Sequence, residues 1–220
     1  MTIVWNLFDC LISPPSHRVF LNKRSGFVLS LVVPLALALC LAVLLSPYML
    51  QAAAQNLAAT DSSQSALILS RVAMSQRIAL VVQPVVTLIV WWLSAMIIAV
   101  GAVFANVRPK IADTVALFGR LSLISLVPNL LGYIVICIEQ HMGYQLTLQP
   151  HFGLDLLIDP ATPLTRVIYA YISPFTLWYI AALCHGIAVL FGISVKRALL
   201  IVSPLLVLQL VPVIGLALLL

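Results

Sequence analysis

The sequence predicts an all-α membrane protein, a bundle of five transmembrane helices with a cytoplasmic N-terminus. Of the 220 residues, 63% are hydrophobic and only 8% are charged, whereas a soluble domain usually carries about 25% charged residues. The charges are also spaced so that they leave five uncharged stretches with the length of a membrane-spanning helix. We expect these spans at about 27–45, 78–106, 121–138, 167–195 and 198–219.

The segment 1–25 is predicted to lie on the cytoplasmic side, and residues 26–220 form the membrane domain. The stretch Thr2–Ile12 is apolar but too short to cross a bilayer. With Trp5 and Phe8 as anchors, it is expected to form a short helix that lies at the membrane surface.

The first two spans are separated by a polar interval. Span one contains Pro34, which membrane helices tolerate, and Ser46–Pro47 is expected to close it. The stretch Ser65–Arg77 has helical propensity, so we expect it to extend the second helix beyond the membrane.

The other three spans are joined by one long and two short connections. A basic loop, 106–120, precedes span three, and Pro128–Asn129 interrupts that span. The interval 139–166 then leads to span four, which has Pro174 near its start. Span five contains Pro204 and follows directly after a basic turn.

The basic residues predict the orientation. Cytoplasmic segments of membrane proteins carry an excess of Lys and Arg. A cytoplasmic N-terminus places eight of them inside and three outside, and the reverse orientation would invert this bias. Of the eight inner residues, all except Arg120 are expected to contact lipid headgroups. The inner residues are Arg18, Lys23, Arg24, Arg108, Lys110, Arg120, Lys196 and Arg197, and the outer ones are Arg71, Arg77 and Arg166.

Four polar side chains fall within the spans: Gln83, Asn129, His185 and Gln209. With Arg120 assigned to a loop, no Asp, Glu, Lys or Arg lies within a span, which disfavours an ion-coupled pump. A lone His in an apolar helix is usually neutral and bonded to a neighbour, so we favour that structural role for His185.

Gln83–Pro84 and Pro128–Asn129 each place an amide beside a proline. The proline frees a carbonyl one turn earlier, and the amide can bond it or a facing helix. We prefer the interpretation that these amides lock kinked helices together; a polar cavity between spans two and three is the alternative. Ala182 and Gly186 form a small-x-x-x-small pair that predicts close helix packing.

Motifs for catalysis are missing. The sequence contains no G-x-S-x-G, no glycine-rich phosphate loop and no C-x-x-C pair. His151 and Asp155 are four residues apart but lack the spacing of a known metal motif, so we interpret the acidic residues there as loop residues. We therefore predict no catalytic, cofactor-binding or metal-binding residue, and no nucleic-acid partner, because the net charge of +5 serves topology.

One segment resembles a known family. The pattern P-F-x-L-W-Y-x-x-x-L-x-x-G-I-A-x-L-x-G-I-S-x-K-R-A at Pro174–Ala198 is similar to the late segment of the Yip1-domain membrane proteins, in their prokaryotic branch. The small-rich stretch Val115–Gly132 and the prolines before Val19–Phe20 are similar to earlier parts of that family. The chain departs from it at Phe118–Gly119–Arg120, where the family often has a Tyr.

The resemblance implies a five-span α-helical bundle with a cytoplasmic N-terminus. Eukaryotic relatives act in vesicle traffic and bind small GTPases through an N-terminal region, which this chain almost lacks. That binding role is therefore not expected here, and the resemblance transfers no catalytic residue.

The leading functional hypothesis is a non-enzymatic protein of the bacterial inner membrane without a cofactor. It would organise membrane lipids or protein partners, alone, with copies of itself or as a subunit of a complex. The alternative is a small transporter or lipid-handling permease-like subunit with a polar path near Gln83 and Asn129. No soluble substrate is predicted. A wide polar cleft between spans two, three and four would favour transport, and a tight, dry bundle would favour the organiser.

Overall fold

A computed structural model describes residues 24–58, 65–143, 152–158 and 162–219. These residues are mostly helical, and the described ranges contain no strand. The all-α class is thereby confirmed. The expected surface helix at Thr2–Ile12 lies outside the described residues, as do Arg18 and Lys23.

Four helices are long and apolar enough to cross a membrane, which is compatible with an integral membrane protein. They belong to α3, α4, α5 and α7, and the further helices of the described part are α6, α8 and the 3-10 turn η1. The bounds are α3 Arg24–Ala58, α4 Ser65–Phe104, α5 Ile111–Met142, η1 Leu154–Leu156, α6 Pro163–Tyr171, α7 Pro174–Phe191 and α8 Val195–Leu219.

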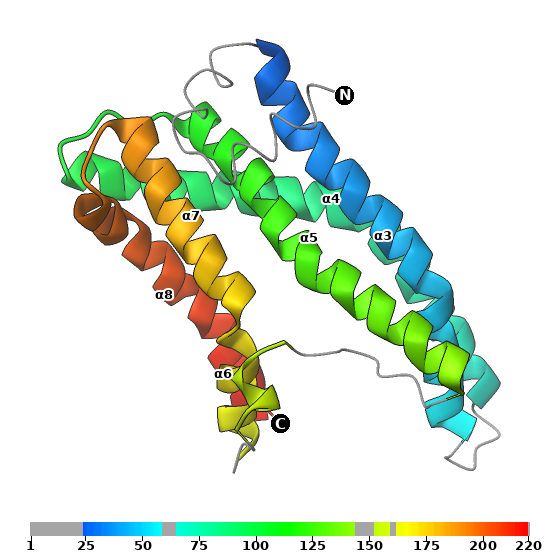
Figure 1. Ribbon diagram of the computed structural model, residues 1–220. Coiled ribbons are helices and arrows are strands. Elements are labelled where there is room, and N and C mark those ends of the chain that lie inside the picture. Colours follow the sequence, from blue (N-terminus) through cyan, green and yellow to red (C-terminus); the bar gives the residue numbers. More distant parts are fainter. Residues whose placement is uncertain (1–23, 59–64, 144–151, 159–161, 220) are drawn as a thin grey trace.

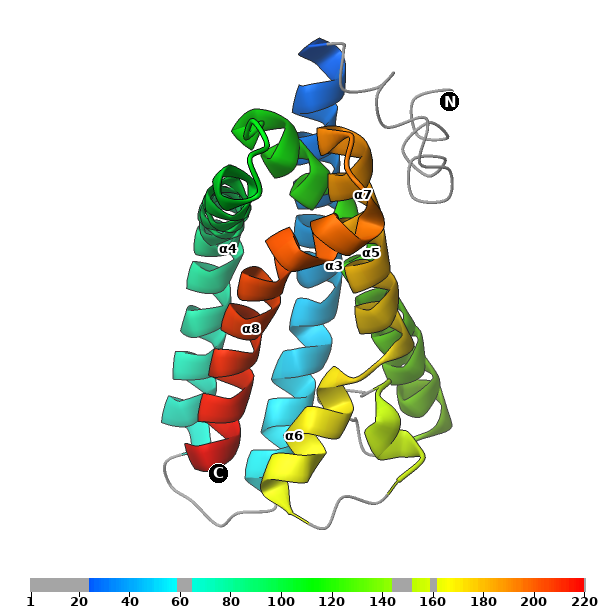
Figure 2. The same ribbon diagram turned by 90° about the vertical axis from the view of Figure 1, so that its left-hand side faces the viewer.

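The helices form a bundle with two distinct ends (Figures 1 and 2). α3 packs on α4 and α5, α5 also packs on α7, and α8 lies between α4 and α7. At one end, α4 turns into α5 and α7 turns into α8. We call it the basic end, because Arg108, Lys196 and Arg197 are exposed there. The opposite end, which holds α6 and the last turns of α3 and α5, is the distal end.

The two turns of the basic end meet through a lysine. The Lys110 ammonium donates a hydrogen bond to the main-chain carbonyl of Leu190, over 3.2 Å. Leu190 lies in the last turn of α7, where carbonyl groups have no partner in the helix and attract positive charge. Gly192 follows with a left-handed φ of 67° and ends α7. Lys110 therefore caps the C-terminal end of α7 and also adds an exposed positive charge to the basic end.

The packed core lies towards the basic end. α4, α5, α7 and α8 contribute one face each, and small residues let these faces approach closely. A Cβ atom on Gly186 of α7 would lie 2.8 Å from the Leu117 side chain of α5. The core residues include Ala95, Ile98, Leu117, Phe118, Ile124, Leu183, Ile187, Ile201 and Val202.

The first two helices are longer than the predicted spans. α4 begins at Ser65, which confirms that Ser65–Arg77 extends the second helix. α3 was expected to close at Ser46–Pro47 but continues to Ala58. It can continue because a proline removes only one donor, and neighbouring helices can satisfy the freed carbonyl.

The prediction of one continuous helix over 167–195 is wrong. The structure divides this region into α6 and α7, with a break at Ile172 and Ser173. The residue before a proline is disfavoured in the helical region, and here Pro174 occupies the first position of α7. The Ser173 hydroxyl accepts a hydrogen bond from the Thr176 N–H at 3.1 Å, so Ser173 caps the new helix.

The predicted loop 106–120 is also too long. α5 begins at Ile111, so the turn is confined to the residues between Phe104 and Ile111. Arg120 consequently lies within a helix and is completely buried. The statement that no charged residue lies within an apolar helix is therefore wrong for Arg120. A hydropathy pattern places the start of this helix after Arg120, because Lys110, Asp113 and Arg120 are charged. It takes no account of where their side chains lie in the fold.

Candidate functional site

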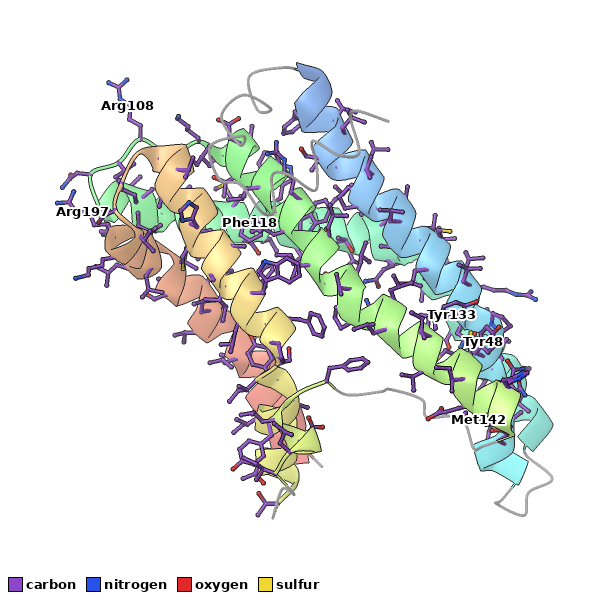
Figure 3. All side chains as sticks on the ribbon, viewed as in Figure 1. Tyr48, Arg108, Phe118, Tyr133, Met142 and Arg197 are labelled. Carbon is purple, nitrogen blue, oxygen red and sulfur yellow. The ribbon has the colours of Figure 1, made fainter. Side chains whose placement is uncertain are left out.

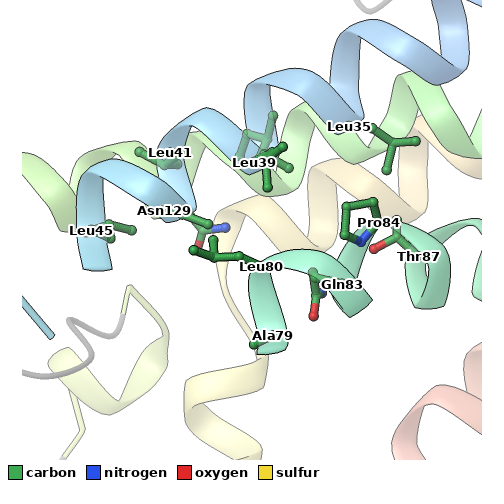
Figure 4. A pocket seen from close by; sticks show the side chains of 13 residues that line it. Leu35, Leu39, Leu41, Leu45, Ala79, Leu80, Gln83, Pro84, Thr87 and Asn129 are labelled. Carbon is green, nitrogen blue, oxygen red and sulfur yellow. The ribbon is translucent and has the colours of Figure 1, made fainter. Parts of the chain in front are cut away.

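A cavity of about 350 Å³ lies between α3, α4 and α5, on the distal side of the core. Figure 4 shows its wall from close by, with α3 and α4 on two sides and Asn129 of α5 between them. The cavity is bounded by the first three long helices. From the sequence we preferred packed helices, with a polar cavity between spans two and three as the alternative; these spans correspond to α4 and α5, and α3 completes the wall. Its lining residues are Leu35, Ala38, Leu39, Leu41, Ala42, Leu45, Ala79, Leu80, Gln83, Pro84, Thr87, Leu126 and Asn129.

Three polar side chains interrupt an otherwise apolar wall. Gln83 and Thr87 are one turn apart on α4, and Asn129 comes from α5. The two amides can each donate and accept hydrogen bonds, and the hydroxyl can do both as well. Among the described residues that line the cavity, none has an ionisable side chain. An apolar pocket with a few polar groups of this kind is the usual form of a small-molecule site.

Small side chains and a proline leave this space open. Ala38 and Ala42 are one turn apart on α3, and Ala79 stands on α4, so these wall positions carry only a methyl group. Pro84 follows Gln83 inside α4, where its ring prevents a regular helical hydrogen bond. The local sequence therefore places small side chains, a proline and Gln83 together at the wall of the cavity.

A set of polar contacts joins the same three helices beyond the cavity, at the distal end. The Ser46 hydroxyl of α3 donates to the Gln76 side-chain oxygen of α4 over 3.3 Å. The Gln140 amide of α5 donates to the Gln51 side-chain oxygen of α3, also over 3.3 Å. We call these two pairs, together with Tyr48 and Tyr133, the distal latch.

The two tyrosines of the distal latch pack edge to face, with ring centroids 5.7 Å apart. Figure 3 shows them side by side between α3 and α5, towards the distal end. Aromatic pairs prefer this geometry, and it adds to the stabilisation from burial. The distal latch thus holds α3 against both neighbours although the helices leave a cavity between them.

On the basic side of the cavity, α3 and α5 are joined by a buried arginine. The Arg120 Nε donates to the Ser30 hydroxyl over 2.8 Å, and that hydroxyl donates to the Gly26 carbonyl over 2.6 Å. Both Arg120 and Ser30 are fully buried. Next to them, a Cβ atom on Gly119 would clash with the main-chain carbonyl of Ser30. The two helices therefore touch backbone to backbone at this point.

The structure brings together two of the predicted intramembrane polar residues and separates the others. Gln83 and Asn129 line the same cavity. His185 lies on α7, half-buried, and does not line the cavity. Gln209 of α8 bonds the Tyr179 side chain of α7.

The small pair Ala182 and Gly186 packs within the chain. Gly186 faces Leu117 of α5, and Ala182 lies against the core. The predicted close approach is therefore present, and it joins two helices of the same molecule. Neither residue is part of the cavity wall.

The predicted headgroup-contact residues that the structure describes lie at one end of the bundle. Arg108 and Arg197 project outward from neighbouring turns (Figure 3). Lys196 is exposed beside Arg197, and Lys110 combines exposure with its bond to α7. Arg24 is the first residue of α3, close to the same end.

Metal binding has no support in the described ranges, which contain no group of three or more His, Cys, Asp or Glu side chains that could hold an ion. Among the cysteines of the described ranges, Cys40 is exposed, Cys137 is half-buried and Cys184 is buried.

Sequence reasoning missed Thr87, Arg120 and Ser30. Thr87 could have been found from its position one turn after Gln83 on the same helix face. Nothing in the spacing paired Arg120 with Ser30, because ninety residues separate them.

Comparison of the chain with protein-family models, with curated proteins and with solved structures gives no match.

Proposed function

We propose that this protein is a non-enzymatic integral membrane protein that binds a lipid-like ligand in the cavity between α3, α4 and α5. One observation carries the proposal: Gln83, Thr87 and Asn129 lie on an otherwise apolar wall around about 350 Å³. This volume falls in the range of small-molecule sites, about 300–1,000 Å³. The ligand would reach the cavity from the membrane that surrounds the helices.

The proposal combines parts of both functional hypotheses. A bundle without cavities would favour a pure organiser of partners, and a wide polar cleft would favour transport of a polar solute. The cavity is mainly apolar, with three uncharged polar groups, so lipid handling is the better fit. Membership of the Yip1-domain family, and protein partners or self-association, remain predictions.

The membrane arrangement is part of the proposal. In it α3, α4, α5, α7 and α8 cross the bilayer, with α6 as a short segment before α7. α8 has 25 residues and is about 37 Å long at 1.5 Å per residue, which suffices to cross. The exposed Arg108, Lys196 and Arg197 favour a cytoplasmic basic end, and the inner membrane of a bacterium is the expected location.

Lipid binding is tested with the intact protein purified in a mild detergent. Native mass spectrometry, followed by lipid analysis of the denatured sample, is expected to show one retained lipid-like molecule per chain. Ala38→Phe fills the cavity and should remove it. Ala36→Phe is the matched control, since Ala36 lies on the same helix but is exposed and does not line the cavity. Equal retention by parent and Ala38→Phe would refute the proposal.

The orientation is tested with single cysteines and a membrane-impermeant maleimide. Leu157→Cys should react in intact cells, because Leu157 is exposed and directly follows η1, which packs on α6 of the distal end. Ser194→Cys, in the turn at the basic end, should react only after the membrane is opened. The parent protein measures the background from the natural cysteines. The opposite pattern would reverse the proposed topology.

A further inference from the structure

We infer that the cavity between α3, α4 and α5 selects an uncharged, single-chain amphiphile whose hydroxyl or carbonyl group bonds to Gln83, Thr87 or Asn129. This inference rests on the proposed function, because it names the chemical class of the lipid-like ligand. Three properties of the cavity carry it: its lack of charge, its volume and the hydrogen-bonding capacity of its wall.

The lack of charge excludes an ionic headgroup. Every lining residue is apolar or neutral. Arg77 lies on α4 six residues before Gln83, which is about 9 Å along the helix, and it is exposed. A phosphate or ammonium group in the cavity would lose its water without gaining a counter-charge, which is strongly unfavourable. A neutral headgroup avoids this cost.

The volume favours one chain. At about 30 Å³ for each water-sized group, 350 Å³ accommodates about twelve non-hydrogen atoms. A single alkyl chain of roughly this size, or part of a longer one, fits. The two acyl chains and the glycerol of a phospholipid do not fit together into this volume.

The polar groups favour a ligand that can hydrogen-bond. Gln83 and Asn129 bring two amides to an apolar wall, and Thr87 adds a hydroxyl. A pure hydrocarbon would cover these groups and leave them unsatisfied, at a cost in binding free energy. A hydroxyl group can donate to an amide oxygen and accept from an amide N–H, and a carbonyl can accept.

The cavity is open to the surroundings of the bundle. Leu39 of α3 and Ala79 of α4 belong to its wall and are also exposed. Apolar side chains beside them, Val43 of α3 and Val82 of α4, are about half exposed. A chain can therefore enter sideways from an apolar phase without passing through water.

The experiment measures binding of tritiated 1-dodecanol to the full chain in nanodiscs, with empty nanodiscs as the background. Saturable binding is expected. Unlabelled 1-dodecanol should compete about tenfold better than dodecane or dodecyl phosphate, the size of effect that one neutral hydrogen bond gives. Equal competition by dodecyl phosphate or by dodecane would overturn the inferred class.

Variants locate the selectivity. Gln83→Leu with Asn129→Leu should weaken dodecanol binding about tenfold and leave dodecane competition unchanged. Thr87→Val keeps the side-chain shape, so it serves if the double variant fails to fold. Ser125→Ala is the control, because Ser125 lies on α5 one turn before Asn129 and does not line the cavity. Dodecanol binding that is unchanged in both Gln83→Leu/Asn129→Leu and Thr87→Val would overturn the inference.

The two proposals fail in different ways. If Ala38→Phe abolishes saturable binding but the three probes compete equally, the cavity binds lipid and only the inferred class is wrong. If neither the parent nor any variant binds a probe saturably, and purified protein retains no lipid, the proposed function fails as well.

Discussion

The two ends of the bundle are packed differently. Near the basic end, Ala95, Ile98 and Ala102 of α4 are completely buried against α5 and α8. Towards the distal end, α3, α4 and α5 surround a cavity of about 350 Å³. The buried apolar cluster there is small, with Ile136 at its centre and Leu45 and Tyr48 beside it.

The difference shows what determines packing in an apolar solvent. Lipid chains are as apolar as leucine, so hydrophobicity does not draw one membrane helix to another. Near the basic end, glycines allow backbones to meet, as at Gly119 against Ser30. At the distal end, polar pairs of the distal latch hold the helices together across the cavity. The helices pack closely where a glycine lets two backbones meet, and open space remains where polar pairs, an aromatic pair and one small apolar cluster bridge the helices.

The strongest way to break the packed half is to add bulk at Gly119. Gly119→Leu would push a side chain into the main-chain carbonyl of Ser30, which cannot move aside like a flexible side chain. We expect a loss of at least about 3 kcal/mol and little folded protein in fluorescence-detected size-exclusion chromatography. Ala112→Leu, at an exposed position of the same helix, should behave as the parent. Normal folding of Gly119→Leu would show that α3 and α5 are further apart than described.

The next largest effect is expected at the buried arginine. Arg120→Met keeps an unbranched apolar stem but is shorter, and it removes the charge and the bond to the Ser30 hydroxyl. A double-mutant cycle with Ser30→Ala, measured as free energy of unfolding in mixed micelles, should give a coupling of about 1.5–3 kcal/mol, the range for hydrogen bonds to charged groups. A coupling near zero would mean that Arg120 is held by other contacts and that Ser30 contributes only space.

One substitution made in both halves sharpens the comparison directly. Ala95→Leu adds three carbons to a completely buried position and should destabilise the protein by about 1–3 kcal/mol. Ala42→Leu adds the same atoms to the cavity wall and should change stability by less than about 1 kcal/mol, because the space is already present. Thermal unfolding in detergent measures both. Equal losses would show that the distal half is packed as tightly as the core.

The smallest effect is expected from the distal latch. Gln140→Leu removes the bond to Gln51 and should cost about 0.6 kcal/mol, the mean for polar contacts between membrane helices. Gln140→Glu/Gln51→Lys is a rescue that restores a polar contact. A loss well above 2 kcal/mol for Gln140→Leu would mean that the distal latch, rather than the core, determines the stability of the bundle.

The sequence was sufficient for the helical class and for the approximate positions of the long helices. Apolar length without charge is a local property, so it can be counted along the chain. From the two amides beside prolines, the sequence also gave a cavity between spans two and three as an alternative. Both corresponding helices, α4 and α5, line the observed cavity, but the contribution of α3 was not predicted. Pro174 was noted in the sequence, but whether it kinks a helix or starts a new one depends on Ser173, which caps α7.

Other features could not be predicted from a single sequence because they depend on contacts between distant residues. In the sequence, Arg120 has the character of a charged loop residue, and only the fold shows that the Ser30 hydroxyl of α3 accepts its hydrogen bond. Ser46 and Gln51 follow the apolar stretch of α3 and look like loop residues, but their partners Gln76 and Gln140 stand on other helices. The cavity depends on which positions of three separate helices face one another, which hydropathy does not record.

The buried Arg120 has a consequence for the order in which the chain enters the membrane during synthesis. An arginine at the centre of a transmembrane helix raises the free energy of insertion by about 2.5–3.5 kcal/mol. Near the end of a helix the cost is lower, but α5 still carries it in an otherwise apolar face. α3 is synthesised first, and its Ser30 hydroxyl accepts a hydrogen bond from Arg120. Insertion of α5 should therefore depend on α3, which must already be in the membrane when Arg120 enters it.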